Sequence, residues 1–381
     1  MKYDFSRLRD YQDSLLPMLN IPGNTLIISK NNEEIYRYTT GFDDIDAGTP
    51  LTDDVYYNVY SISKVTTAVA AAQLLERGEI CLSEPLYAYI PEYRDMYIRE
   101  KTDEGERLVK AKNPITLRQL MTMTAGFDYN LESPSIKGVA EKSGGACPTL
   151  DVVRAIAKEP LLFEPGTHYS YSLGLDIMGG VIEVVTGMRL RDYVRENIFQ
   201  PLGMTRTFYH PTKEINMKLA AQYERGNDGS VRHVDSTCRH RLGEEFDGGG
   251  AGLVSVADDQ LLLAEALAGM GVGRSGERIL SPAAVDLMRT NMLDPVQLTE
   301  FRSAPHFYGY GYGMGVRTNM TRAYGNLSPV GEFGWDGAKG ALLLADPAND
   351  VAFFYVEHVG GSQMVVHNRL RNLIYAALGT P

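Results

Sequence analysis

Apolar and polar positions follow a strand-like pattern near both ends of the chain. Short apolar runs at residues 26–28 and 35–38 flank an Asn-Asn pair, which predicts two strands joined by a tight turn. Residues 340–345 and 351–356 form a second pair of apolar runs, separated by a turn rich in Asp, Asn and Pro. The sequence therefore predicts β-hairpins at both ends.

The middle of the chain instead shows the 3.6-residue period of helices that bury one face. The segments with this spacing are residues 116–124, 150–158, 173–186 and 190–199, and residues 362–378 repeat it near the C-terminus. Strands at both ends that enclose a helical middle predict an α/β (α+β) fold. We expect residues 1–85 and 245–381 to form a discontinuous sheet domain and residues 86–244 a mainly helical one, with the active site in the cleft between them.

Composition narrows the classes of protein that this chain can be. Its 381 residues are 44% hydrophobic and 22% charged, which is typical of a globular protein long enough for two domains. A formal net charge of −11 disfavours a nucleic-acid partner, so the basic run 239–241 is interpreted as a solvated loop. The three cysteines form no CxxC pair and no HExxH motif occurs, so neither a metal nor another cofactor is expected.

The distribution of charged and apolar residues also predicts where in the cell the protein is found. The N-terminal segment carries charge throughout and lacks the apolar core of a signal peptide, and no run approaches 18 apolar residues. We therefore expect a cytoplasmic protein without a membrane span that acts on a small molecule. The sequence leaves the oligomeric state open.

The sharpest chemical signal is Ser61-Ile62-Ser63-Lys64, at the start of a predicted helix that stops at Gly78. In a first helical turn, free backbone amides and the helix dipole stabilise negative charge on a nearby oxygen. Lys64 follows Ser61 on the same helix face, close enough to exchange a proton with its hydroxyl. A desolvated lysine would favour the neutral form that a base requires. Alone, the motif also fits a capping serine followed by an exposed lysine.

Two further segments carry candidate site residues. Tyr171 lies in a turn that leads directly into a predicted helix, where a phenol beside an ammonium group can relay protons. Gly334-Trp335-Asp336-Gly337 opens the C-terminal hairpin, where glycines allow the backbone to approach a ligand closely. Each has a plainer explanation when taken alone, since most of the 23 tyrosines and the single tryptophan would serve in packing.

These segments, in this order and spacing, resemble the serine β-lactamase and penicillin-binding superfamily, and within it the class C β-lactamase-like enzymes called family VIII carboxylesterases. The resemblance covers most of the chain. The matching segments are residues 61–64, 115–126, 165–167, 171–176, 248–255 and 335–337. The resemblance implies a β-lactamase/transpeptidase-like fold, with an antiparallel sheet flanked by helices and an all-helical domain.

The resemblance also implies roles for the site residues. Ser61 would be acylated, with Lys64 and Tyr171 as general base and acid. The backbone amides of Ser61 and Ala338 would form the oxyanion hole. Which of the two bases takes the first proton is left open. The residues expected to contact the substrate are Trp335, Gly337 and Tyr129.

Departures from the β-lactamase pattern change the expected substrate. Leu173 stands where lactamases present the Asn of Tyr-x-Asn, so an amide that would bind Lys64 and a lactam is lost. Trp335 replaces the cation of Lys-Thr-Gly, which suits neutral esters better than an antibiotic carboxylate. Asp336 is unusual, because family VIII esterases usually have Gly there. If strand alternation turns its carboxylate away from the cleft it matters little; if not, anionic substrates are disfavoured further.

The sequence thus predicts a serine hydrolase that cleaves short-chain, neutral carboxylic esters through an acyl-enzyme on Ser61. The alternatives on the same fold are a β-lactamase, a D-amino-acid peptidase or an acyltransferase, so the substrate is an ester or an amide. A non-catalytic binding protein is disfavoured, because it needs no nucleophile paired with bases. A conventional α/β-hydrolase is disfavoured because no Gly-x-Ser-x-Gly motif occurs.

Overall fold

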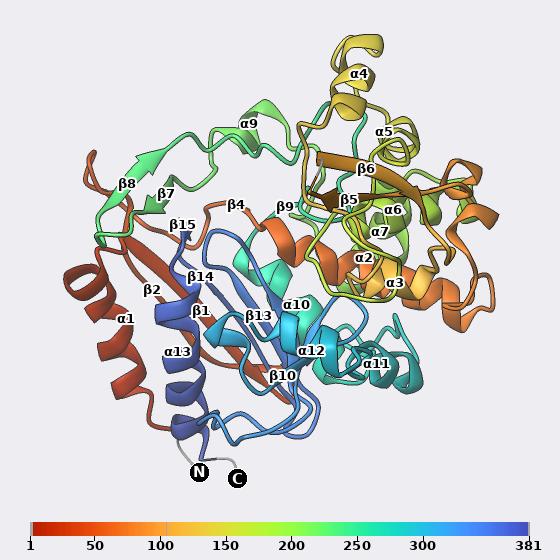
Figure 1. Cartoon of the computed structure of the whole chain (residues 1–381). Helices are drawn as coiled ribbons and strands as arrows, with labels where there is room; N and C mark the ends of the chain where they lie inside the picture. The colour runs from red at the N-terminus through yellow and green to blue at the C-terminus, as the bar shows by residue number, and fades with distance from the viewer. Residues whose placement is uncertain (1–2, 104, 380–381) are drawn as a thin grey trace.

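The computed structural model describes residues 3–103 and 105–379 of the chain. Its main element is an antiparallel sheet of eight strands in the order β10-β11-β12-β13-β14-β1-β2-β3 (Figure 1). The strands are β1 (Gly23–Lys30), β2 (Glu33–Asp44), β3 (Thr49–Pro50), β10 (Tyr310–Tyr312), β11 (Arg317–Asn319), β12 (Phe333–Asp336), β13 (Leu342–Asp346) and β14 (Val351–Val356). The predicted α/β (α+β) class is confirmed.

The two ends of the chain meet within this sheet. β1 pairs antiparallel with β14, so that Leu26 lies opposite Tyr355. Both predicted hairpins are present, as β1–β2 and β13–β14. In the first turn, Asn31 and Asn32 have φ values of 53° and 60°. Asn tolerates this left-handed conformation, which a tight two-residue hairpin turn requires.

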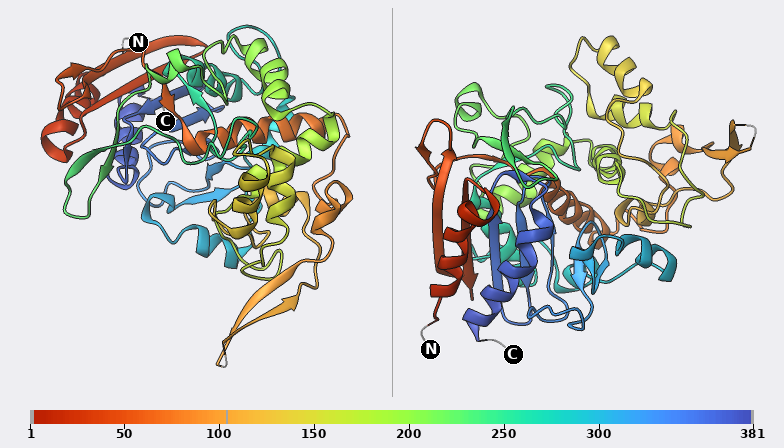
Figure 2. Two further views of the ribbon diagram at one scale, coloured as in Figure 1. Left: turned by 90° about the horizontal axis from the view of Figure 1, so that it is seen from above. Right: turned by 60° about the vertical axis from the view of Figure 1, so that its left-hand side comes forward.

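Helices cover both faces of the sheet (Figures 1 and 2). The helices of these layers are α1 (Ser6–Leu19), α2 (Ser63–Glu76), α10 (Ala257–Ala268) and α13 (Gln363–Leu378). α1 and α13 lie side by side on one face, and α10 packs on the other. Strand alternation explains the two layers: Leu342 and Leu344 belong to the core under α13, whereas Leu343 belongs to the core that contains α2 and α10.

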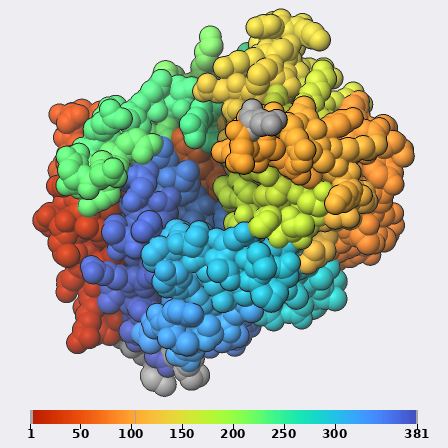
Figure 3. All heavy atoms as spheres, in the orientation of Figure 1, coloured from red at the N-terminus to blue at the C-terminus, as the bar shows by residue number. Residues whose placement is uncertain are grey.

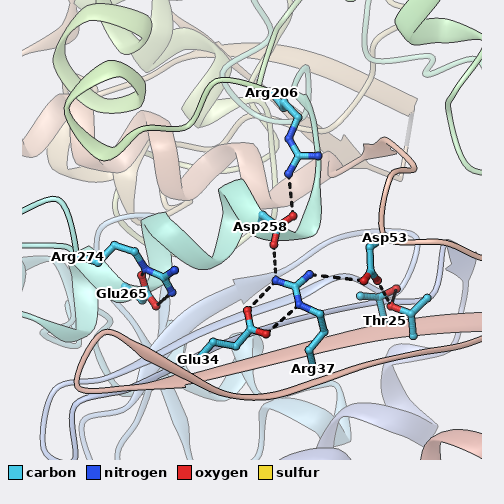
Figure 4. A network of polar contacts seen from close by, with 9 residues as sticks. Thr25, Glu34, Arg37, Asp53, Arg206, Asp258, Glu265 and Arg274 are labelled. Atoms are coloured by element: carbon cyan, nitrogen blue, oxygen red, sulfur yellow. Dashed lines mark hydrogen bonds and ion pairs between the residues drawn. The ribbon is translucent and has the colours of Figure 1, made fainter.

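A network of charged side chains joins α10 to β2 (Figure 4). Arg37 of β2 donates to Glu34 at 2.9 and 2.7 Å, and to Asp258 in the first turn of α10 at 2.5 Å. Asp258 also accepts a hydrogen bond of 2.7 Å from Arg206, which comes from the segment after α8. One carboxylate at a helix N-terminus therefore links the sheet to the helical part of the chain.

The middle of the chain is mainly helical. Its helices are α3 (Leu117–Met121), α4 (Pro134–Lys142), α5 (Thr149–Ile156), α6 (Gly174–Thr186), α7 (Leu190–Val194), α8 (Gln200–Leu202) and α9 (Lys213–Asn216), and α11 (Pro282–Met288) and α12 (Pro295–Phe301) follow α10. The short turns are η1 (Tyr60–Ile62), η2 (Leu86–Ala88), η3 (Pro91–Tyr93), the π-helical η4 (Arg195–Phe199) and η5 (Pro305–Phe307). The predicted central helices correspond to α3, α5, α6 and α7 with η4.

Short strands also occur in residues 86–244, the part of the chain that was expected to be mainly helical. β5 (Tyr97–Thr102) and β6 (Gly105–Lys110) form a projecting hairpin (Figure 2). The remaining strands are β4 (Tyr57–Asn58), which pairs with β9 (Val254–Ser255), and β7 (Gln222–Arg225), which pairs with β8 (Val231–Val234) and β15 (Val359–Gly360). β5 and β6 are mostly exposed, so they lack the apolar alternation that marks a strand. The division at residues 85 and 245 stays a proposal.

None of the helices within residues 3–103 and 105–379 combines the length and the apolar character needed to cross a membrane. The same residues contain no group of three or more His, Cys, Asp or Glu side chains arranged to hold a metal ion. The cysteines are free thiols, with Cys81 exposed and Cys147 and Cys238 buried.

Candidate active site

Ser61 lies in the single turn η1, which leads directly into α2. The preceding residue, Tyr60, has a φ of 47°, a left-handed conformation that residues other than glycine seldom adopt. The Tyr60 side chain is held by a hydrogen bond from its hydroxyl to Gln222 and by an edge contact with His240. This turn presents Ser61 at the mouth of the helix, with 8% of its surface exposed.

Lys64 is fully buried in the first turn of α2. Its ammonium nitrogen donates to Gly250 O at 2.7 Å, and lies 3.4 Å from Ser61 Oγ and 3.3 Å from Tyr129 OH. Burial lowers the pKa of Lys64, but the neighbouring phenols in their ionised form and the Asp176 carboxylate outweigh burial, so the net shift of the pKa is upward. The neutral lysine expected from desolvation alone is therefore not favoured.

Tyr171 reaches Ser61 from the loop that precedes α6. Its hydroxyl lies 2.7 Å from Ser61 Oγ, within hydrogen-bonding distance. The loop is held in place by a backbone hydrogen bond of 2.9 Å from Ser170 N to Met123 O. The structure thus brings Ser61, Lys64 and Tyr171, which are far apart in the chain, into one contact group.

Tyr129 lies next to Lys64 and Tyr171. Leu173, which stands at the Asn position, is buried in the core at the start of α6 and offers Lys64 no polar atom. Tyr129 instead places its hydroxyl beside Lys64 and its ring on that of Tyr171. It therefore contacts Lys64 and Tyr171 directly, although it was expected to line the cleft and is not among the residues that line the cavity beside Ser61.

Trp335 continues a row of stacked rings beside Ser61. Its Nε1 donates to Tyr171 OH at 3.3 Å, and the two rings stack with centroids 5.8 Å apart. Phe307 stacks on the other side of Trp335 at 5.6 Å, and Phe301 stacks on Phe307 at 4.7 Å. We call Tyr129, Tyr171, Trp335, Phe307 and Phe301 the aromatic row. Trp335 is 4% exposed, so it packs in the core and also faces the site.

The turn that follows β12, residues 337–341, lies against η1. Gly337 N donates to Ala341 O at 2.8 Å, which closes the turn. A Cβ on Gly337 would lie 2.8 Å from Val59 O, so only glycine permits this close approach. Ala338 is exposed, and no backbone carbonyl within the described residues accepts a hydrogen bond from its amide. The Ala338 amide is therefore available to a ligand.

The carboxylate of Asp336 points away from the cleft. Its Oδ1 lies 3.6 Å from Arg317 NH2 and 3.5 Å from His367 Nδ1, and both carboxylate oxygens are buried. Burial opposes ionisation, but Arg317 and His367 outweigh it and hold the pKa of Asp336 well below its usual range. Strand alternation thus turns Trp335 to the cleft and Asp336 toward α13. Of the two arrangements considered from the sequence, this is the one in which the Asp336 carboxylate faces away from the cleft.

A cavity of about 430 Å³ opens beside Ser61. Figure 3 shows this face of the molecule hollowed where the blue C-terminal segment, the cyan segment near residue 300 and the yellow-green segment meet. The large apolar and aromatic residues that line the cavity are Tyr169, Tyr171, Phe301, Phe307, Trp335 and Met364, and polar or acidic residues such as Glu300 and Gln363 line it as well. Of the described residues that line it, none is a lysine or an arginine. The cavity therefore suits a neutral, apolar group.

Three residues near the site were not assigned a role from the sequence. Asp176 Oδ1 accepts a hydrogen bond of 2.9 Å from Gly250 N, and Gly250 O in turn binds Lys64. His240 packs edge-on against Tyr129, and burial together with Lys64 lowers the pKa of His240 to about 4. The interpretation of residues 239–241 as a solvated loop is thus wrong for His240, which is buried. Asp176 and Gly250 lie in segments that carry the family resemblance, so the sequence could have pointed to them. Nothing in the sequence around His240 indicated that it lies near the site.

Comparison with known proteins finds relatives that are similar to this chain over most of its length. Esterase EstB of Burkholderia gladioli is 27% identical over an alignment 398 positions long, which covers 97% of this chain and 95% of the relative. Monacolin J acid methylbutanoyltransferase of Aspergillus terreus is 28% identical over 348 residues, which cover 87% of this chain and 83% of the relative.

The solved structure of EstCE1, described as a hydrolase with promiscuous acyltransferase activity, has the same fold. Its TM-score is 0.77 at 24% identity, and the match covers 98% of each chain. A model of the Beta-lactamase family matches residues 8–376, nearly the whole sequence. The protein therefore belongs to the Beta-lactamase family and is an enzyme of the serine hydrolase type.

Proposed function

We propose that the protein is a carboxylesterase that cleaves neutral esters through an acyl-enzyme on Ser61. The observation that carries this proposal is the contact of Ser61 Oγ with two proton-handling groups, Tyr171 OH at 2.7 Å and Lys64 Nζ at 3.4 Å. A serine hydroxyl becomes a useful nucleophile when such groups can take its proton. The similarity to Esterase EstB over most of the chain supports the same reaction class.

In the proposed first step, Tyr171 takes the hydroxyl proton of Ser61 as a phenolate while Oγ attacks the ester carbonyl carbon. The Lys64 ammonium, 4.6 Å from the centroid of the Tyr171 ring, stabilises that phenolate. Lys64 Nζ also lies within reach of Ser61 Oγ, at 3.4 Å, so transfer of the first proton to the lysine is the alternative order. Tyr171 then protonates the departing alkoxide oxygen as the carbon–oxygen bond breaks, which releases the alcohol.

Deacylation follows with water as the second nucleophile. Tyr171 takes a proton from the water as its oxygen attacks the acyl carbon, and returns that proton to Ser61 Oγ as the acyl–oxygen bond breaks. The backbone amides of Ser61 and Ala338 are the proposed donors to the oxyanion in both steps. The close approach at Gly337, which brings the turn against η1, supports this pairing.

The walls of the cavity support a neutral ester as the substrate. A carboxylate beside Ser61 would meet the aromatic row and no lining lysine or arginine among the described residues. The replacement of the lactamase amide by Leu173 and of the lactamase cation by Trp335 further disfavours lactams. We therefore expect higher kcat/KM for p-nitrophenyl acetate and butyrate than for nitrocefin or a D-Ala-D-Ala peptide.

The test combines ester turnover with intact-mass analysis of the protein during the reaction. We expect the wild type to hydrolyse p-nitrophenyl butyrate and to carry a butyryl adduct, and we expect Ser61→Ala to lose both. Ser275→Ala, which changes an exposed serine in the loop after α10, is the matched control and should retain full activity. A wild type without turnover or adduct, or a fully active Ser61→Ala variant, would contradict the proposal.

A second candidate is transfer of the acyl group to an alcohol instead of water. The similarity to the methylbutanoyltransferase of Aspergillus terreus favours it. The two functions share the acyl-enzyme and differ in the group that removes the acyl chain. Product analysis in the presence of methanol or 1-butanol separates them: an esterase yields mainly butyric acid, whereas an acyltransferase yields mainly the new ester.

A further inference from the structure

Two side chains of α13 contact the turn 337–341: Gln363, which also lines the cavity beside Ser61, and His367, which is buried behind the turn. Gln363 Nε2 donates to Gly337 O at 2.8 Å, and His367 Nε2 lies 3.3 Å from Gly340 O. Gln363 and His367 are one helical turn apart, so they share a face of α13. The two carbonyls that they contact lie on either side of Ala338 in the chain.

The His367 ring also contacts the residue that precedes the turn. Its Nδ1 lies 3.5 Å from Asp336 Oδ1, and Asp336 is in turn 3.6 Å from the buried guanidinium of Arg317. His367 is 1% exposed, so its ring cannot turn toward solvent. One buried side chain therefore spans the stretch from Asp336 to Gly340.

The turn is closed by two backbone hydrogen bonds of its own, from Gly337 N to Ala341 O at 2.8 Å and from Gly340 N to Gly337 O at 3.1 Å, and the contacts with α13 add to these. Gly337 and Gly340 flank the exposed Ala338, and Gly340 has a φ of 82°, in the left-handed region. Glycines give a free turn many conformations, and only some of them aim the Ala338 amide at Ser61. An amide stabilises a developing oxyanion strongly only when its direction is fixed before the reaction begins.

We propose that His367 and Gln363 are positioning residues that fix the direction of the Ala338 amide for the reaction at Ser61. The proposal rests on the proposed function, in which this amide is an oxyanion donor. His367 acts through the backbone and does not touch the substrate, since it is buried behind the turn. Its removal should weaken binding of the transition state while leaving binding of the ester ground state nearly unchanged.

The experiment measures kcat and KM for p-nitrophenyl butyrate, and the inhibition constant of n-butylboronic acid, which forms a tetrahedral adduct on a reactive serine. We expect His367→Leu to lower kcat roughly 10- to 100-fold with KM within about twofold, and to weaken boronate inhibition in parallel. His367→Gln, which keeps an N–H donor, should recover part of the loss. Arg369→Gln, an exposed change on the same helix, is the matched control.

A change at the buried His367 could prevent folding, so Gln363→Leu is a second variant for the same test. Gln363 is only half-buried, so its replacement should leave the protein folded. We expect it to lower kcat in the same direction while the thermal melting temperature stays near that of the wild type. Folded His367→Leu and Gln363→Leu proteins with unchanged kcat and boronate affinity would overturn the positioning role. An equal loss in His367→Gln, or a change confined to KM, would overturn it too.

These outcomes are distinct from failure of the proposed function. The wild type is first examined for a butyryl adduct on Ser61 by intact mass. If the adduct is absent, the esterase proposal itself fails. If it is present and the α13 variants behave like wild type, only the positioning role fails.

Discussion

The ring of Tyr129 lies parallel to the ring of Tyr171, with centroids 5.5 Å apart and planes 7° apart. The Lys64 ammonium lies near the centroids of both rings, at 5.1 Å and 4.6 Å. A cation close to aromatic rings is stabilised in its charged form. Tyr129 therefore contacts Lys64 with both its hydroxyl and its ring, whereas Leu173 offers Lys64 no polar atom.

The hydroxyl of Tyr129 is the first feature to test. Tyr129→Phe keeps the ring stack but removes the oxygen 3.3 Å from Lys64 Nζ. We expect kcat for p-nitrophenyl butyrate to fall roughly 10- to 100-fold, because a hydrogen bond involving a charged group is worth about 1.5 to 3 kcal/mol. Tyr97→Phe, a change in the projecting β5–β6 hairpin, should have no effect. Wild-type kcat in folded Tyr129→Phe would refute the importance of this contact.

A second prediction concerns the indole N–H of Trp335. Trp335→Phe preserves stacking within the aromatic row but loses the donor to Tyr171 OH. We expect kcat to fall roughly three- to tenfold with little change in KM, the loss expected for one neutral hydrogen bond. Trp335→Ala should in addition raise KM, because it opens the wall of the cavity. Equal KM values for the Phe and Ala variants would show that the ring does not contact the substrate.

A third prediction follows from the close approach at Gly337. In Gly337→Ala the new Cβ would lie 2.8 Å from Val59 O and 2.9 Å from Ala341 Cβ. We expect a loss of about 1 to 3 kcal/mol in the free energy of unfolding, together with reduced kcat. The matched control is Gly138→Ala in α4, where a Cβ meets nothing within 4 Å. That change should stabilise the protein by about 0.5 to 1 kcal/mol, and urea unfolding measures both.

A fourth prediction concerns Glu357, whose side chain packs against Gly340. Burial raises the pKa of Glu357 to about 7, and its carboxyl accepts a hydrogen bond of 2.5 Å from Tyr355 OH. Because the folded-state pKa lies above the unfolded value of about 4.3, stability falls as pH rises from near that value through 7, by on the order of 3 kcal/mol.

Glu357→Gln should remove this pH dependence, since an amide does not ionise. We expect the variant to melt at a higher temperature than the wild type at pH 8, and the two melting temperatures to converge near pH 4. Parallel curves for the two proteins from pH 4 to pH 8 would show that Glu357 does not titrate in this range.

A fifth prediction concerns Asp258, in the network of Figure 4, whose pKa is shifted downward and not upward as for Glu357. Burial opposes ionisation of Asp258, but Arg37 and Arg206 outweigh it and lower its pKa. The resulting stability is present above the unfolded pKa of about 3.9 and is lost as pH falls through the lower folded pKa.

Asp258→Asn should therefore destabilise the protein by about 1 kcal/mol at pH 7, a value typical of partly exposed pairs, and by much less at pH 3. Exposed Asp46→Asn is the control and should leave the melting temperature nearly unchanged at both pH values. A constant difference between the Asp258→Asn and wild-type melting temperatures from pH 3 to pH 7 would contradict the charge-based explanation.

The sheet could be predicted where sequence patterns are local. The hairpins β1–β2 and β13–β14 combine apolar runs with turn residues, and the Asn-Asn pair suits the positive φ values found there. The strands β5 and β6 escaped prediction because exposed side chains leave no apolar alternation. The same limit applies to β8, whose side chains are exposed or only partly buried.

The site could be predicted only in part, because its electrostatics depend on residues distant in the chain. The motif at Ser61 and Lys64 and the loop at Tyr171 named the contact group only together with the family resemblance, since each alone also fits a structural role. The charge state of Lys64 was not predictable, since it depends on Tyr129 and Asp176 as neighbours. The direction of Asp336 stayed open until β12 and α13 were placed. The roles of these residues in the reaction remain a proposal.

The pairing of β1 with β14 has a consequence for synthesis of the protein. The chain leaves the ribosome from its N-terminus, so β1 waits without one of its partners until almost all of the remaining sequence has been translated. Ser61 is made early and Ala338 late, so the two halves of the proposed oxyanion hole cannot meet in a nascent chain. Truncated products should therefore be inactive, and the exposed edge of β1 makes them candidates for capture by chaperones.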